Sequence, residues 1–209
     1  MPRPTPESRP GPAGSSRVAA LVLAAGGATR FGSPKAIAVL DGRPLLEHVL
    51  DVAAAARLEP VVVVLGEAAH QIEAVVAWRE ERRVRNPDPA RGLSSSLRIG
   101  IEAVAALQPA VDAVVILLGD QPRVRSDVVA ALLARRPHTD RQIVAPRYAG
   151  DGGSNPIVVD RSAFDLAADS VGDRGLGPLI ASRPDLVELV EIAGSNPDVD
   201  TPADLADLA

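Results

Sequence analysis

The sequence contains no cysteine. This absence excludes a disulfide scaffold, a cysteine-ligated zinc or iron–sulfur site, and thiol catalysis. Aromatic residues are also scarce, with one tryptophan, one tyrosine and two phenylalanines among 209 residues. A surface that stacks the bases of single-stranded nucleic acid would need more of them. The core must therefore consist mainly of aliphatic side chains.

An excess of positive charge and long apolar runs are missing too. The chain has 22 Lys and Arg against 27 Asp and Glu, a net charge of −5, which argues against a nucleic-acid partner. No apolar run reaches the length of a membrane span, and the first residues lack the apolar stretch of a signal peptide. We therefore expect a cytoplasmic protein whose partners include neither nucleic acid nor a membrane.

The chain length predicts one domain preceded by a tail. At roughly 150 residues per domain, a single unit can bury a sizeable core without a disulfide or a metal. Residues 1–16 hold five prolines, two glycines and no large aliphatic side chain. Such a segment cannot bury enough surface to offset the entropy of ordering it. We predict a disordered tail over residues 1–16 and a single domain over residues 17–209.

After the tail, short apolar runs alternate with amphipathic stretches. Wholly apolar runs are typical of strands buried on both faces, and they occur at 18–24, 61–65 and 113–118. Further strands are predicted near Val84 and at 142–145, 157–159 and 186–192. Helices are predicted at 44–56, 68–78, 126–135, and 94–107 with Ser94 as N-cap. A capping box at 201–204 predicts a short terminal helix.

This alternation predicts an α/β fold of the three-layer αβα, Rossmann-like kind. The sheet should be mostly parallel and covered by helices on both faces. Ligands of such folds bind beyond the carboxyl ends of the strands. The residues that follow Ala24, Leu118 and Ile192 are therefore the first candidates for a functional site.

The first predicted strand ends in a turn of small residues, Ala24–Gly27, followed by Arg30 and Lys35. Small residues let backbone N–H groups approach a phosphate closely, and two cations on one loop can bind a polyphosphate and stabilise a leaving pyrophosphate. The spacing is neither that of a dinucleotide fingerprint nor that of a Walker A loop. The alternative is an ordinary Gly-rich turn with solvated basic residues.

Carboxylates and hydroxyls stand at three later positions of interest. Asp120 follows the third apolar strand, where it could hold Mg²⁺ or set up an Asx turn before Pro122. Asp198 and Asp200 precede the terminal helix, where they could supply a second ligand or simply favourable charge. The segment 92–98 carries three serines; a helix cap explains Ser94 and leaves the other two without a role.

Residues 23–35, LAAGGATRFGSPK, resemble the L-A-A-G-x-x-x-R-x-G-x-x-K signature of the MobA-like nucleotidyltransferases. Five further segments are similar to those of the family and occur in the same order: GLSSSL at 92–97, GDQP at 119–122, SNP at 154–156, GDRG at 172–175 and DVDTP at 198–202. The resemblance covers essentially all of residues 17–209 and implies a nucleotidyltransferase fold. At Ser154 the chain departs from the glycine that the family usually carries.

The resemblance implies a reaction in which an acceptor phosphate attacks the α-phosphorus of a nucleoside triphosphate and pyrophosphate leaves. It implies Lys35 and Arg30 as the catalytic cations and Mg²⁺ as the cofactor, held by Asp120 and Asp200. The remaining binding residues that it implies are Ala24, Ala25, Gly26, Gly27, Ser94 and Ser95 around the nucleotide, and Asn155 and Asp173 on the acceptor side.

The donor and the acceptor also follow from the resemblance. Relatives that transfer GMP usually carry Gly-Gly where this chain has Ala25-Gly26, whereas relatives that transfer CMP to molybdopterin carry Ala-Gly. This implies CTP as donor and molybdopterin as acceptor, with a molybdoenzyme or its chaperone as protein partner. A methyl group at Ala25 would narrow the base pocket against a purine. Related enzymes act on sugar or alcohol phosphates, so that class of acceptor stays open.

Two other classes of protein remain as alternatives. A non-catalytic nucleotide-binding protein would not need Lys35, Asp120 and Asp200 together. A dinucleotide-dependent oxidoreductase would need G-x-G-x-x-G and an acidic residue at the end of the second strand, where Gly66 stands. The three histidines are scattered and form neither a metal pair nor a hydrolytic triad.

Overall fold

The computed structural model describes residues 16–26, 31–150, 153–170 and 172–208. The predicted tail lies outside these residues except for Ser16, and the single domain stays a prediction. The strands are β1 (Val18–Ala24), β2 (Val39–Leu40), β3 (Arg43–Pro44), β4 (Val61–Leu65), β5 (Arg82–Arg85), β6 (Ala113–Leu118), β7 (Ile143–Tyr148), β8 (Ile157–Asp160) and β9 (Val187–Ile192). The α-helices are α1 (Leu45–Ala55), α2 (Ala69–Val75), α3 (Leu93–Ala105), α4 (Ser126–Arg135), α5 (Phe164–Ala168), α6 (Gly177–Ser182) and α7 (Pro202–Leu208).

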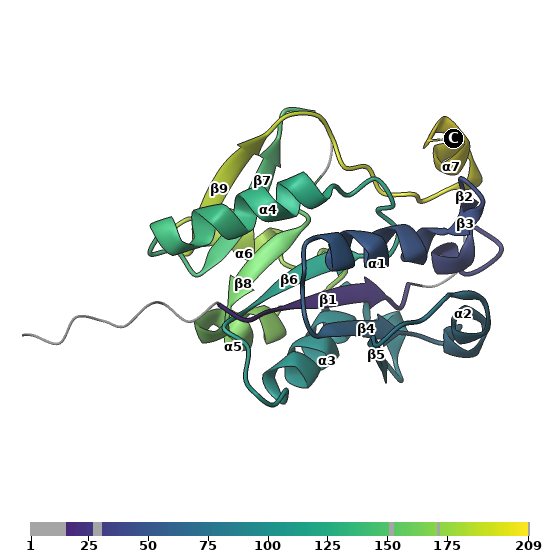
Figure 1. Ribbon diagram of the computed structural model, residues 1–209, viewed down its shortest axis with the longest axis horizontal. Helices are drawn as coiled ribbons and strands as arrows, with labels where there is room; N and C mark the ends of the chain where they lie inside the picture. The colour runs from purple at the N-terminus through teal and green to yellow at the C-terminus, as the bar shows by residue number, and fades with distance from the viewer. Residues whose placement is uncertain (1–15, 27–30, 151–152, 171, 209) are drawn as a thin grey trace, which may run out of the picture.

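Seven strands form one sheet in the order β5-β4-β1-β6-β8-β7-β9. Strand β8 runs antiparallel to both β6 and β7, while the other neighbours are parallel. The prediction of a mostly parallel sheet is therefore confirmed. Figure 1 shows β1 inside this sheet, between β4 and β6, so its backbone hydrogen bonds are satisfied on both edges.

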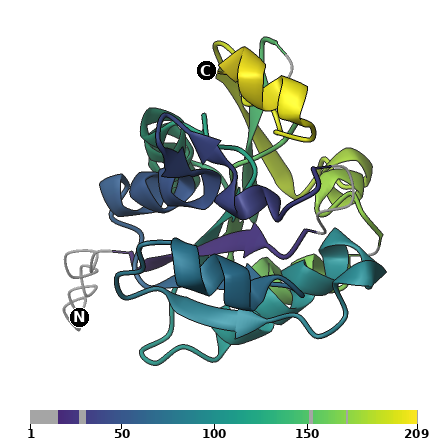
Figure 2. The same ribbon diagram turned by 90° about the vertical axis from the view of Figure 1, so that its right-hand side faces the viewer.

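Helices cover both faces of the sheet, which confirms the three-layer αβα fold. Side chains alternate along β1: Ala20 and Val22 pack with α1 and α4, while Ala19 and Leu21 pack with α3 and α5. Figures 1 and 2 show β1 between these two helical layers. The four β1 residues are fully buried, which explains why the strand is apolar throughout instead of alternating.

The predicted strands at 18–24, 61–65 and 113–118 and the helix at 126–135 have the same bounds in the structure. The helix predicted at 68–78 is shorter, because α2 ends at Val75. Ser94 as N-cap is wrong: α3 begins at Leu93 and its N-cap is Gly92, which has a φ of 91° and makes no side-chain cap. Pattern analysis missed the two-residue strands β2 and β3 and the short helices α5 and α6, because elements this short show no clear period.

A small apolar cluster attaches the end of the chain to its first third. Val199 packs with Leu40 and Leu45 from the β2–β3 hairpin and α1, and Leu205 of α7 joins them. Figures 1 and 2 both show α7 beside this hairpin. The capping box is confirmed, because Asp204 N–H donates to Thr201 Oγ1 (3.2 Å) and Asp204 Oδ2 accepts from Thr201 N–H (2.7 Å).

Among the described residues, no helix is both long enough and apolar enough to cross a membrane.

Replacement of Gly66 by alanine is expected to lower the free energy of unfolding by about 1–3 kcal/mol, because overpacking forces the backbone to shift. A Cβ at Gly66 would lie 2.6 Å from the carbonyl oxygen of Ala25. Urea unfolding measures the change. Gly177→Ala is the matched control, since a Cβ there meets no atom within 4 Å. Equal stability changes in the two variants would contradict the close approach of Gly66 to β1.

Candidate functional site

The carboxyl ends of β1, β4 and β6 meet at one edge of the sheet, as the parallel register requires. Ala24 and Ala25 are buried where β1 ends, and Gly26 is exposed. Gly119 allows β6 to approach this turn, because a Cβ there would lie 2.9 Å from the Cβ of Ala24. Gly27 and Arg30, which the sequence analysis placed in the phosphate turn, lie outside the described residues.

Lys35 joins two carboxylates that are far apart in the sequence. Its Nζ donates to Asp120 Oδ2 at 2.9 Å and to Asp200 Oδ1 at 2.8 Å. Burial lowers the pKa of Lys35, but the charges of Asp120 and Asp200 and their hydrogen bonds outweigh it and raise the pKa above its usual value. The ammonium is therefore firmly charged and stands between the two carboxylates.

The segment that carries Asp200 is fixed by backbone contacts. Val199 N–H donates to the carbonyl of Asp120 (2.9 Å), which ties the segment to the end of β6. Asp200 N–H donates to Asp204 Oδ2 (2.9 Å) within the cap of α7. The proximity of Asp120 and Asp200 thus follows from the backbone hydrogen bond of Val199 and the cap of α7, and not from the position of either residue in the sequence.

Asp198 is a third carboxylate at this edge. Its Oδ1 accepts from Gln121 Nε2 at 2.8 Å. Burial first, and then the charge of Asp120, raise the pKa of Asp198 above its usual value. Asp198 lines both cavities described below, so its carboxyl group faces any ligand that occupies them.

The donor set of Asp120 and Asp200 fits a hard divalent cation. Both carboxylate oxygens contact one ammonium, so they lie within two hydrogen-bond lengths of each other. Mg²⁺ is commonly held by one or two carboxylates together with substrate phosphates, so it needs no all-protein cage. The residues that the structure describes contain no group of three or more His, Asp or Glu arranged to hold a metal.

A cavity of about 330 Å³ opens above the β1 turn. Its lining includes Ala25 and Gly26 from the turn and Ser96 from α3. Ser94 and Ser95 are buried and do not line it; the Ser95 hydroxyl donates to the Gly92 carbonyl (2.8 Å). Sequence reasoning singled out Ser94 and Ser95 for the nucleotide, whereas the structure places Ser96 at the cavity.

Asn86 organises the serines of α3. Its Nδ2 donates to Ser95 Oγ (2.8 Å) and to Ser96 Oγ (2.9 Å), and all three side chains are buried. Gly92 is needed just before them for two reasons. Its φ of 91° favours glycine, and a Cβ would lie 2.1 Å from Asp173 Oδ1. The close approach of Gly92 and Asp173 brings the loop of residues 172–175 to the N-terminus of α3.

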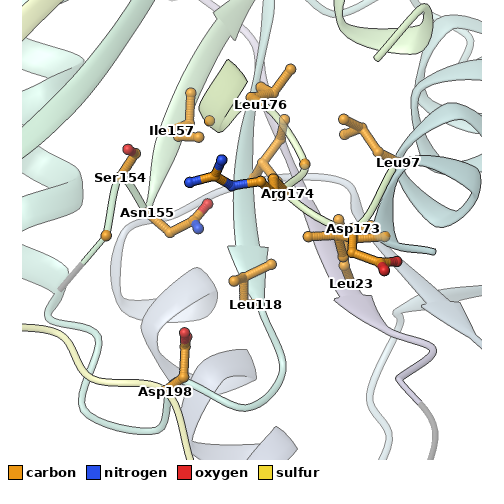
Figure 3. Close-up of a pocket in the computed structure, with 15 residues that line it drawn as sticks. Leu23, Leu97, Leu118, Ser154, Asn155, Ile157, Asp173, Arg174, Leu176 and Asp198 are labelled. Atoms are coloured by element: carbon orange, nitrogen blue, oxygen red, sulfur yellow. The ribbon is translucent and has the colours of Figure 1, made fainter. Parts of the chain in front are cut away.

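A second cavity, of about 440 Å³, adjoins the first and shares Asp173 and Asp198 with it. Asn155 lines this cavity, as the sequence analysis expected for the acceptor side, and the neighbouring Ser154 lines it too. Figure 3 shows the Arg174 side chain reaching across the cavity toward Asn155. The floor is apolar and is made by Leu23, Leu97, Ile116, Leu118, Ile157 and Leu176.

Sequence reasoning did not assign a role to Ser96, Gln121 or Asn196. Ser96 was part of the GLSSSL motif, but which serine faces a ligand depends on where α3 begins. Gln121 stood in the GDQP motif and is 2% exposed, a signal available only from the structure. Asn196 lies outside every motif, and nothing in the sequence distinguishes it.

Comparisons with known proteins show the family of the chain. The family described as the MobA-like NTP transferase domain matches residues 20–187, and the chain belongs to this family of nucleotidyltransferases. The chain is 30% identical to the nicotine blue oxidoreductase of Paenarthrobacter nicotinovorans over 88% of its own length and 92% of that protein. It is 33% identical to the bifunctional protein GlmU of Desulfitobacterium hafniense over 61% of its length, and the match spans only 27% of GlmU.

Solved structures show the same fold. The crystal structure of Rv0371c from Mycobacterium tuberculosis H37Rv superposes with a TM-score of 0.82 at 32% identity, covering 93% of this chain and 98% of that one. A second structure of Rv0371c, in complex with manganese, gives a TM-score of 0.77 at 30% identity, covering 92% of this chain and 98% of that one. The seven-stranded α/β architecture is therefore the nucleotidyltransferase fold.

Replacement of Lys35 by methionine is expected to strengthen the binding of a free divalent cation. A cation that takes Asp120 and Asp200 must displace the ammonium that neutralises them, and the variant has no ammonium to displace. The rise in melting temperature on addition of MnCl₂ measures this binding and should exceed that of the wild type. Lys35→Arg, which keeps the charge, should respond as the wild type does. Equal responses in all three proteins would show that the ammonium and the metal do not compete.

Proposed function

We propose that this protein is a Mg²⁺-dependent nucleotidyltransferase of the molybdenum cofactor cytidylyltransferase type, which transfers CMP from CTP to a phosphate of molybdopterin. The observation that carries the proposal is a pair of adjoining cavities, of which the smaller is lined by Asp120 of the Lys35–Asp120–Asp200 cluster. A donor nucleotide and an acceptor must lie side by side for transfer. Asp173 and Asp198 line both cavities and mark the boundary between them.

The chemistry asks for positioning and charge stabilisation more than for covalent steps by the protein. An oxygen of the acceptor phosphate forms a bond to the α-phosphorus of the nucleoside triphosphate. The bond between the α-phosphorus and the oxygen that joins it to the β-phosphorus breaks, and pyrophosphate leaves with the electron pair of that bond. The ammonium of Lys35 would bind the phosphates, and Arg30 would stabilise the charge of the leaving group. When bound, Mg²⁺ on Asp120 and Asp200 supplies further neutralisation of phosphate charge.

The small turn at the end of β1 supports CTP as the donor. Ala25 is 7% exposed and lines the smaller cavity with Gly26 and Ser96. A methyl group at this point reduces the width available to a base, which favours a pyrimidine over a purine. Ser96, with Asn86 behind it, offers a buried hydroxyl to the nucleotide.

The larger cavity suits an acceptor with a phosphate and an extended apolar or aromatic body. Arg174 supplies a cation at its rim, and Asn155 supplies a carboxamide. The apolar floor would bury a ring system such as a pterin. A sugar phosphate would instead place its hydroxyl groups against these apolar side chains. A sugar or alcohol phosphate is therefore the less favoured acceptor. A molybdoenzyme or its chaperone would be the protein that receives the product.

An oxidoreductase is the second candidate, because the similarity to nicotine blue oxidoreductase spans 92% of that protein. The turn after β1 lacks the spacing of a dinucleotide fingerprint, and β4 is followed by Gly66 instead of an acidic residue. Consumption of NADH or NADPH with a dye as acceptor would favour this candidate. Release of pyrophosphate that depends on a nucleoside triphosphate and an acceptor would favour nucleotidyl transfer.

Thermal unfolding in the presence of CTP, GTP, ATP or UTP, each with and without Mg²⁺, tests the donor. A ligand at 100 times its Kd adds about 2.7 kcal/mol, which for this chain length raises Tm by about 5–10 °C. We expect CTP with Mg²⁺ to give the largest rise and Asp120→Ala to abolish it. A preference for another triphosphate would overturn CTP as donor, and no response to any of them would overturn the transferase proposal.

Replacement of Ala25 by glycine is expected to shift the preference toward GTP. Removal of one methyl group from a closely packed pocket changes discrimination by about tenfold or more. The ratio of the Kd values for GTP and CTP, measured by calorimetry, reports the shift. Melting temperatures without ligand control for loss of the fold. An unchanged ratio would show that Ala25 does not select the base.

A further inference from the structure

Two buried amide side chains lie beneath the boundary of the two cavities. Gln121 is 2% exposed and Asn196 is 1% exposed. Asn196 Nδ2 donates to Gln121 Oε1 at 3.0 Å, so the two side chains bond to each other. Gln121 directly follows Asp120 after β6, and Asn196 lies after β9. The pair therefore joins strand ends that are distant in the sequence and separated in the sheet.

Each amide also holds a residue of the site. Gln121 Nε2 donates to Asp198 Oδ1 (2.8 Å), which faces both cavities. Asn196 Nδ2 donates to the backbone carbonyl of Asn155 (3.1 Å), on the wall of the larger cavity. Figure 3 shows Asn155 and Asp198 among the side chains that surround this cavity. A continuous chain of hydrogen bonds thus runs from Asp198 through the pair to Asn155.

The orientation of the Asn196 amide is fixed by its partners. Both groups that its nitrogen contacts, Gln121 Oε1 and the Asn155 carbonyl, are acceptors. A flipped amide would set oxygen against oxygen at both contacts. Asn196 Oδ1 is buried and has no partner among the described residues, which is costly for a buried oxygen. The donor end must therefore contribute enough to keep this amide in place.

We propose that Gln121 and Asn196 are positioning residues for nucleotidyl transfer, which hold the acceptor-side wall at Asn155 at a fixed distance from the carboxylate segment that carries Asp198. The proposal rests on the proposed function, because it concerns how an acceptor is placed against a nucleotide. Neither amide is among the residues that line the two cavities described above, so each acts through the residue it holds. Misplacement of reacting groups by about 1 Å can lower the rate of transfer by about 100-fold.

The chain carries its own reporter of this arrangement. Tyr148 is the single tyrosine, and its hydroxyl donates to the same Asn155 carbonyl at 3.0 Å. The NMR signals of a ¹³C-labelled tyrosine ring therefore report the surroundings of that carbonyl, which include the Asn196 side chain, without any substrate. The test compares the wild-type full chain with Gln121→Leu/Asn196→Leu. Replacement of both partners by apolar side chains of similar size can be nearly neutral for stability.

Asn86→Leu is the matched control, because Asn86 is an equally buried amide that bonds to Ser95 and Ser96 on the nucleotide side. We expect the tyrosine signals to move in the double variant and to stay in place in Asn86→Leu. We expect kcat/KM for the acceptor to fall by about 100-fold in the double variant while stabilisation by CTP is kept. Asn86→Leu should show the reverse, with weaker stabilisation by CTP.

Wild-type tyrosine signals and wild-type acceptor kinetics in a folded double variant would overturn the proposal. Gln121→Met is measured beside the double variant, and takes its place if that variant does not fold. It keeps the length of the side chain, removes only the bonds of Gln121 and leaves Asn196 next to Tyr148, so a move of the tyrosine signals in Gln121→Met reports a shift of Asn155. A wild type that responds to no nucleotide and transfers to no acceptor would overturn the proposed function instead. The tyrosine signals would still decide whether the amide pair positions Asn155.

Discussion

The parallel register of β1 with β4 and β6 is the constraint on which the site depends. Ala24 is level with Leu65, and Leu23 is level with Leu118. Because parallel strands end at the same edge, the turn after β1 and the carboxylate after β6 must meet there. Glycines at the ends of β4 and β6 let the backbones approach closely enough, since a Cβ at either one would collide with β1. The cluster of Lys35 and its carboxylates is built on this edge.

Charge then connects this edge to the last segment of the chain. Lys35 neutralises Asp120 and Asp200, which come from the middle and the end of the sequence. The apolar contact of Val199 with Leu40 and Leu45 keeps the last segment in place beside the β2–β3 hairpin. The segment before the final helix is therefore part of the site, because the packing of Val199 and its hydrogen bond to Asp120 hold Asp200 beside Lys35.

Buried amide side chains hold the residues around the two cavities in similar ways. Asn86 holds the serines of α3 on the side proposed for the nucleotide, while Gln121 and Asn196 hold Asp198 and the Asn155 loop on the side proposed for the acceptor. A buried donor that loses its partner is costly, so such groups favour one arrangement over near alternatives. Two cavities proposed to hold two substrates at a fixed separation would benefit from walls of this kind.

The sequence by itself determined the layers of the fold and the family. Strands 18–24, 61–65 and 113–118 were predicted with the bounds they have, because burial on both faces requires apolar residues throughout. The capping box at 201–204 was also predicted, because its hydrogen bonds join residues close together in the sequence. Tertiary structure alone decided that β8 runs antiparallel, that Gly92 and not Ser94 caps α3, and that Lys35 bonds to two carboxylates at once. It also placed Ser96 at the cavity instead of its neighbours, because successive helical residues point about 100° apart and one residue of offset changes which side chain faces the ligand. These features depend on contacts between segments tens of residues apart, and the pattern within a single segment carries no information about them.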